Sequence, residues 1–186
     1  MNNDVTIKNY HDLAMRTAKR MDWKDNVVHA ALGLASEWCE YQLAASEEFR
    51  GRLSDQEAFL ASVKANVTKE LGDLCWFTAF AAELFGARFE SLGDHDFLEF
   101  ELEPVVNQGI LNVTSRVKRL VAYNSDRGIG KIVEDLNYIV AGVRRLCVVW
   151  GIDFTEVLQV NIDKLRERFP DQYSDAAALA RADVKE

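Results

Sequence analysis

The sequence has few of the residues that interrupt helices or cross-link chains. Its 186 residues include only 2 prolines, 10 glycines and 3 cysteines, which favours long helices. Cys39, Cys75 and Cys147 lie far apart without C-x-x-C spacing, so they predict neither a zinc site nor a disulfide framework. A reducing, cytoplasmic compartment fits such cysteine usage best.

Long apolar runs and an excess of positive charge are also missing. The start, MNNDVTIKNYHD, has no apolar signal core, and apolar stretches such as residues 76–82 are too short to span a bilayer. Lys and Arg number 22 against 30 Asp and Glu, which gives a net charge of −8. We therefore expect neither a membrane nor duplex nucleic acid as a partner. An anionic ligand would need a cation between itself and this chain, and a metal ion is the obvious candidate.

Apolar residues make up 48% of the chain and recur at helical spacing, which predicts an all-α helical bundle. We expect one domain over residues 1–186, in which the last residues fray. Capping boxes at residues 54–57 and 153–156 predict helix starts, and Gly86 and Gly151 predict helix ends. Five core helices are expected, over residues 25–45, 54–85, 105–123, 131–150 and 153–169.

The two halves of the chain, about residues 25–95 and 104–170, align with each other at a shift of 65 residues. The aligned pairs are Leu71 with Leu136, Gly86 with Gly151, and Phe89 with Phe154. This match favours two fused helical-hairpin repeats with internal pseudo-two-fold symmetry. The general similarity of any two helical hairpins explains the match equally well, so both interpretations stay open.

Two acidic pairs carry the strongest chemical signal: Glu37 and Glu40 in ASEWCEY, and Glu70 and Asp73 in KELGDLCW. The i, i+3 spacing puts each pair on one helix face, and two antiparallel helices would aim all four carboxylates at one point. Such a cluster in an apolar bundle needs a cation. Because oxygen ligands select hard ions, we expect Mg²⁺, for which Mn²⁺ can substitute. Capping, pairing or solvent-facing roles are the alternative for each acid.

Two other kinds of metal enzyme fit the sequence less well. A di-iron carboxylate bundle requires Glu-x-x-His on two helices, and no glutamate here has a histidine three positions later. A His-Asp phosphohydrolase would use His11-Asp12 and His95-Asp96. Both dipeptides are expected in polar, irregular surface stretches.

One helix face near the C-terminus offers candidate ligands for a polyphosphate. Asn161, Lys164 and Arg168 are spaced i, i+3, i+7, so an amide and two cations share that face. An exposed helix end whose cations complement the helix dipole is the alternative. Lys118, Arg119 and Tyr123, on the third expected helix, form a comparable group.

Aromatic side chains close to the acidic motifs are candidates for contacts with a nucleobase. Such a ligand requires an aromatic or apolar slot with a few polar groups. His29 and Trp38 lie on the same predicted helix as Glu37. Core packing is the alternative for the tryptophan, which alternates with the acidic residues.

The sequence resembles the MazG-like all-alpha nucleoside triphosphate pyrophosphohydrolases, which include the dimeric dUTPases and dCTPases. Three segments, in this order, carry the resemblance: HAALGLASEWCEY, KELGDLCWF and NIDKLRERFP. The resemblance covers about residues 29–170. It implies a helical bundle that hydrolyses (deoxy)nucleoside triphosphates to the monophosphate and pyrophosphate, as a homo-oligomer (dimer or tetramer). It implies that the catalytic Mg²⁺ ligands are Glu37, Glu40, Glu70 and Asp73. The phosphate contacts that it implies are Asn161, Lys164 and Arg168, together with Lys118, Arg119 and Tyr123.

The sequence departs from this family in two ways. The segment between Glu40 and Glu70 is at or beyond the long end of the family's range, and the Lys…Tyr stretch follows ExxD instead of preceding it. At the 65-residue shift, Glu70 aligns with Asp135 and Asp73 aligns with Tyr138. We therefore hypothesise that the first half holds the metals and the second half supplies structure and cationic phosphate ligands. A non-catalytic protein that binds nucleotide or metal, and a purely structural bundle, remain alternatives.

Overall fold

The computed structural model describes residues 4–47, 56–93 and 102–180, and every regular element within them is a helix. The bounds of the helices are α1 (Ile7–Met15), α2 (Trp23–Glu47), α3 (Gln56–Leu84), α4 (Leu102–Tyr123), α5 (Ile132–Trp150), α6 (Phe154–Arg168) and α7 (Asp175–Ala180). Two short 3₁₀ turns, η1 (Phe89–Ser91) and η2 (Ile129–Lys131), precede α4 and α5.

The five expected core helices correspond to α2 through α6, with ends that differ by a few residues. The predicted cap of α6 is present, because the Asp153 carboxylate accepts hydrogen bonds from the backbone N–H groups of Thr155 (2.6 Å) and Glu156 (3.3 Å). Gly151 ends α5 with a φ of +60°, a conformation that favours glycine. The capping box expected at residues 54–57 starts outside the described residues.

The expectation that His11 and Asp12 lie in an irregular surface stretch is wrong, because both lie in α1. A further helix, α7, follows α6, and the last residues, 181–186, for which fraying was expected, lie outside the described residues. A reciprocal capping box begins α1: Asn9 N–H donates to Thr6 Oγ1 (3.3 Å), and Thr6 N–H donates to Asn9 Oδ1 (2.7 Å). The helix then buries one face, which includes His11. The second dipeptide, His95-Asp96, lies outside the described residues.

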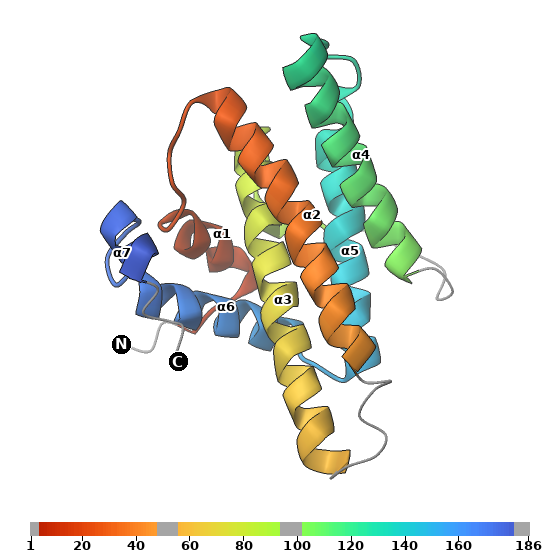
Figure 1. Cartoon of the computed structure of the whole chain (residues 1–186), viewed down its shortest axis with the longest axis vertical. Coiled ribbons are helices and arrows are strands. Elements are labelled where there is room, and N and C mark those ends of the chain that lie inside the picture. Colours follow the sequence, from red (N-terminus) through yellow and green to blue (C-terminus); the bar gives the residue numbers. More distant parts are fainter. Residues whose placement is uncertain (1–3, 48–55, 94–101, 181–186) are drawn as a thin grey trace.

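Two antiparallel hairpins, α2–α3 and α4–α5, form the body of the fold (Figure 1). In their packing, α2 contacts α4 and α3 contacts α5. The shorter α6 crosses α3, and α1 lies over both α3 and α6. Helices α2 and α3 pack closely at Gly33, where a Cβ would overlap the ring of Phe77. This arrangement brings α2 and α6 against α3. These three helices carry the acidic pairs and the phosphate ligands predicted near the C-terminus, Asn161, Lys164 and Arg168.

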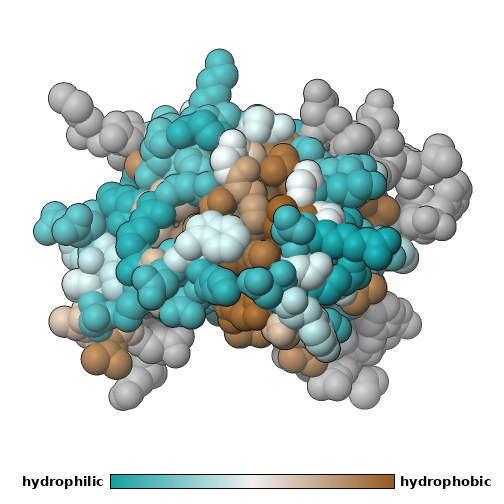
Figure 2. All heavy atoms as spheres, turned by 90° about the horizontal axis from the view of Figure 1, so that it is seen from above, coloured by the Kyte–Doolittle hydropathy of each residue, from teal (hydrophilic) through white to brown (hydrophobic). Residues whose placement is uncertain are grey.

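The surface of the bundle is mixed in polarity. Seen from the end at which α2 begins and α4 ends, apolar side chains are visible between hydrophilic ones (Figure 2). No helix within the described residues is both long enough and apolar enough to cross a membrane.

Candidate functional site

Three of the four predicted acids converge between α2 and α3. Glu37 of α2 and Glu70 and Asp73 of α3 each offer one carboxylate oxygen, and these oxygens lie within 4.8 Å of one another. Glu70 is buried, whereas Glu37 and Asp73 are partly buried. The i, i+3 spacing on α3 and the antiparallel contact with α2 together produce the cluster.

The negative charge of this cluster affects the pKa of Glu37. Burial, followed by the negative charges of Asp73, Glu40 and Glu70, raises the pKa of the Glu37 carboxyl from 4.5 to about 7. The Lys164 ammonium opposes this effect only in part. The site therefore favours additional positive charge.

Glu70 provides an independent sign that the site suits a cation. Its Oε1 pairs with the Lys69 ammonium at 3.0 Å. Its Oε2 is buried and has no hydrogen-bond partner among the described residues, an arrangement that is costly for a carboxylate. The donors of the cluster are all carboxylate oxygens, the type that Mg²⁺ and Mn²⁺ prefer. The residues present thus fit a hard divalent cation.

Helix α6 adds an amide and an ammonium to the same place. Asn161 Nδ2 donates to Asp73 Oδ1 (2.9 Å), and Lys164 Nζ donates to both Asp73 oxygens, at 2.5 Å to Oδ1. The close approach of α6 to α3 depends on Gly72, since a Cβ there would lie 2.9 Å from the Cβ of Asn161. Asn161 and Lys164, expected to contact phosphates, therefore contact a predicted metal ligand in this structure.

The cluster borders a cavity of about 660 Å³, a size that is typical of small-molecule sites. Its polar lining includes Glu37, Asp73, Lys164 and Arg168. Its other walls are mainly apolar and aromatic, and they include Val28, Leu32, Trp76, Phe77 and Phe169. One cavity thus combines acids and cations with aromatic surface.

His29 lies among the aromatic residues of this cavity. Its ring packs edge-on against Phe77, with the ring centroids 5.4 Å apart, and close to Trp76. Burial, with a smaller effect from Lys19, lowers the pKa of the imidazole below 6.5. This shift favours the neutral imidazole. The Nδ1 of His29 is buried without a hydrogen-bond partner among the described residues.

Glu40 and Trp38 do not lie with the other predicted site residues. Glu40 is exposed and outside the cluster of three, although its charge acts on Glu37. Trp38 is buried in the core, where its Nε1 donates to Asn107 Oδ1 (2.5 Å) and its ring stacks on Tyr41. Because α2 turns Trp38 away from Glu37, it does not line the cavity.

The second predicted cationic group also lies elsewhere. Lys118, Arg119 and Tyr123 are exposed near the C-terminal end of α4, and none of them lines the cavity. Tyr123 has 71% of its surface exposed. Within one copy of the chain, these residues therefore do not contribute to the site.

In the second hairpin, the acidic residue at the position equivalent to Glu70 is paired with an arginine. Asp135, which the 65-residue shift aligns with Glu70, is buried and pairs with Arg116 Nε at 2.6 Å. Asn112 Nδ2 donates to the same carboxylate (2.9 Å). A cationic side chain of the protein thus neutralises Asp135. Both the division of roles between the two halves and the repeat itself stay predictions.

Sequence reasoning missed the contribution of α1, of the segment that follows it, and of the segment between α6 and α7. Tyr10 of α1 contacts Asn161, and Thr17, Lys19 and Tyr173 line the cavity. The Thr6–Asn9 capping box was the signal available for α1. Comparisons of this chain with protein-family models, curated proteins and solved structures gave no match.

Proposed function

We propose that this protein hydrolyses (deoxy)nucleoside triphosphates to the monophosphate and pyrophosphate, in the manner of the MazG-like all-alpha pyrophosphohydrolases. One observation carries the proposal. Glu37, Glu70 and Asp73 converge beside Lys164, and Glu37, Asp73 and Lys164 line a cavity whose other walls are mainly aromatic and apolar. A nucleotide has the matching parts, because its polyphosphate needs cations and its base needs aromatic surface.

Glu37, Glu70 and Asp73 would hold Mg²⁺ or Mn²⁺, and the negative charge of Glu40 acts on Glu37. The ion, when bound, supplies positive charge for the phosphate oxygens and makes a water molecule a better nucleophile at neutral pH. It also explains how a chain with a net charge of −8 accepts a polyanion. The remaining tasks fall to the side chains around the ion.

The proposal assigns two cations of α6 to the phosphates. The Lys164 side chain is 19% exposed and lines the cavity, as does Arg168. An ammonium held near Asp73 would be shared between that carboxylate and an arriving phosphate, which fixes the orientation of the polyphosphate. Asn161 is only 2% exposed, so we assign it to the support of Asp73 instead of to direct phosphate contact.

The aromatic part of the cavity is suited to the base. Trp76 and Phe77 provide apolar surface, and the neutral imidazole of His29 supplies a hydrogen-bonding group. Glu37 and Glu40 are the carboxylates proposed to accept a proton from the attacking water. Glu37 is partly buried in the cavity wall, whereas Glu40 faces solvent next to it.

Two further expectations accompany this proposal. A homo-oligomer would cover some of the large apolar side chains that are exposed in one copy, such as Leu43, Leu111 and Val148. A cytoplasmic location agrees with nucleoside triphosphates as substrates and with three free cysteines. Size-exclusion chromatography with light scattering tests the first expectation.

The decisive experiment is a panel of ribo- and deoxynucleoside triphosphates incubated with the protein and Mg²⁺ or Mn²⁺. Chromatography separates monophosphate, diphosphate and pyrophosphate. The proposal predicts equal amounts of monophosphate and pyrophosphate, formed only when metal is present. The Glu70→Gln variant preserves the shape of the side chain and is expected to be inactive.

A matched control removes a carboxylate far from the cluster. Glu134→Gln, on the exposed side of α5, changes the net charge equally and should leave turnover unchanged. Formation of diphosphate and inorganic phosphate would contradict the proposed reaction. Binding of nucleotide and metal without turnover would instead favour a non-catalytic nucleotide-binding protein.

A further inference from the structure

The hydroxyl of Tyr10 meets the side chain of Asn161 inside the protein. Tyr10, on α1, is completely buried, and its O–H donates to Asn161 Oδ1 at 2.9 Å. The same amide donates from Nδ2 to Asp73 Oδ1 at 2.9 Å. Three side chains from α1, α6 and α3 thus form one chain of hydrogen bonds that ends at a predicted metal ligand.

The direction of this chain follows from its two ends. The Asp73 carboxylate only accepts hydrogen bonds, so the amide must turn its NH₂ group toward Asp73. The amide oxygen then faces Tyr10 and requires a donor. Burial is the main cause that raises the pKa of Tyr10 well above 10, so the hydroxyl keeps its proton and can fill that role.

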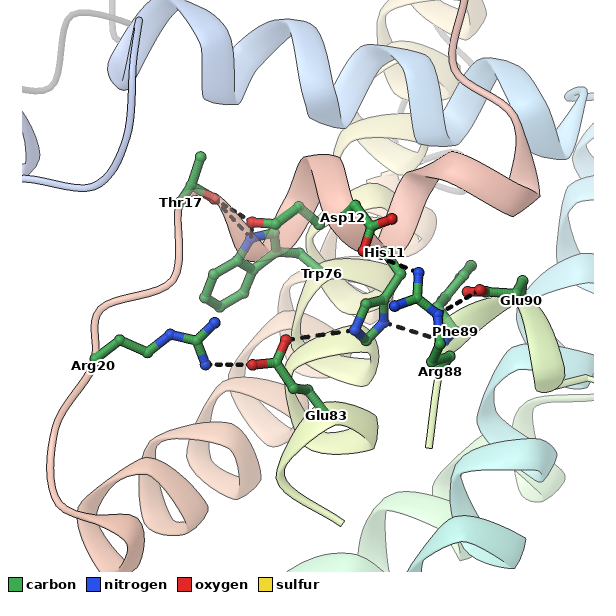
Figure 3. A network of polar contacts seen from close by, with 10 residues as sticks. His11, Asp12, Thr17, Arg20, Trp76, Glu83, Arg88, Phe89 and Glu90 are labelled. Carbon is green, nitrogen blue, oxygen red and sulfur yellow. Dashed lines mark hydrogen bonds and ion pairs between the residues drawn. The ribbon is translucent and has the colours of Figure 1, made fainter. Parts of the chain in front are cut away.

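The position of Tyr10 is fixed by contacts on both sides of it. The adjacent His11 accepts a hydrogen bond at Nδ1 from the backbone N–H of Phe89 (3.2 Å), and its Nε2 lies 3.4 Å from Glu83 Oε2 (Figure 3). At Ala14, one turn further along α1, the backbone carbonyl accepts a hydrogen bond from Trp76 Nε1 of α3 (3.2 Å). These bonds attach α1 to α3 and η1 independently of the Tyr10 hydroxyl.

We propose that Tyr10 is a positioning residue for the metal site, which orients the Asn161 amide so that it holds Asp73 in place. This inference rests on the proposed function, because it assigns Asp73 to a metal. Without the hydroxyl, the amide oxygen of Asn161 loses its donor in a buried position, and the amide is then held at one end only, by its bond to Asp73. The amide therefore holds the Asp73 carboxylate less firmly.

The test measures binding of Mn²⁺ alone, by the electron paramagnetic resonance signal of the free ion, for wild type and Tyr10→Phe. The substitution preserves the ring, whose centroid lies 4.8 Å from that of Phe89. We expect roughly 10-fold weaker Mn²⁺ binding, at the low end of the effects that follow the loss of an outer partner of a ligand. Circular dichroism melting in EDTA confirms that each variant is folded.

A matched control removes a buried tyrosine hydroxyl that serves no ligand. Tyr41 is 1% exposed, and its hydroxyl accepts a hydrogen bond from Trp150 Nε1 (3.3 Å). Tyr41→Phe should lower the melting temperature to a similar extent and leave Mn²⁺ affinity unchanged. The control separates positioning of Asp73 from a general loss of stability.

A double-mutant cycle with Asn161→Ala tests the route of the effect. The Asn161→Ala variant should bind Mn²⁺ at least as weakly as Tyr10→Phe, and adding Tyr10→Phe to it should produce no further loss. An equal loss in both backgrounds would overturn the inference, as would a Tyr10→Phe protein that binds Mn²⁺ like Tyr41→Phe. If the wild-type protein binds no Mn²⁺, the proposed function fails first and the inference fails with it.

Discussion

Substitution of Glu37 by glutamine should stabilise the protein in the absence of metal, although it removes a predicted metal ligand. The folded carboxyl has a pKa of about 7, compared with 4.5 for an exposed glutamate. Between these values the folded state binds more protons than the unfolded state, so this group lowers stability as the pH rises. The penalty is absent below about pH 4.5 and complete above about pH 7.

The size of the effect follows from the displacement of the pKa. The displacement corresponds to at most about 3.4 kcal/mol, and screening of a partly exposed side chain reduces this to about 1–2 kcal/mol. Glutamine has the same shape and no charge. We therefore expect Glu37→Gln in EDTA at pH 8 to raise the melting temperature by about 2–8 °C, with little change at pH 5.

The assay is thermal and urea unfolding at pH 5, 6, 7 and 8, with EDTA or with Mg²⁺. Saturating Mg²⁺ should stabilise the wild type, by about 2.7 kcal/mol at 100 times its dissociation constant. The variant should lose most of this gain. Glu134→Gln serves as the control, since a carboxylate in the first turn of α5 favours the helix and its removal should slightly destabilise. A Glu37→Gln variant that is less stable at pH 8, or whose effect is the same at pH 5 and pH 8, would refute the reasoning.

Two further predictions concern α6 and the α2–α3 contact. Lys164→Met removes the ammonium that contacts Asp73 and lines the cavity, and it should raise the KM for a triphosphate about 10-fold or more. Steady-state kinetics measure this effect. An unchanged KM would argue against a phosphate contact. Gly33→Ala places a methyl group against the ring of Phe77 and should destabilise the protein by about 1–3 kcal/mol in urea unfolding. The control, Gly130→Ala, adds a methyl group with no neighbour within 4 Å and should be close to neutral, so equal effects at both glycines would contradict this explanation.

The sequence alone was enough to predict the fold class, the five long helices and the placement of Glu70 and Asp73 on one face of a helix. These predictions succeed because helical periodicity and i, i+3 spacing are local properties of the chain. Missing α1 was an error of a different kind. Its apolar face is short, and its capping box ends in Asn9 instead of the more usual Glu or Gln.

Only the tertiary structure decided which predicted ligands share a site. Spacing along α6 could group Asn161 with Lys164, but only the crossing of α6 over α3 at Gly72 shows that both contact Asp73. The same packing leaves Lys118 exposed on α4. Long-range contacts of this kind depend on how helices pack, and residue spacing within a single helix contains no information about it.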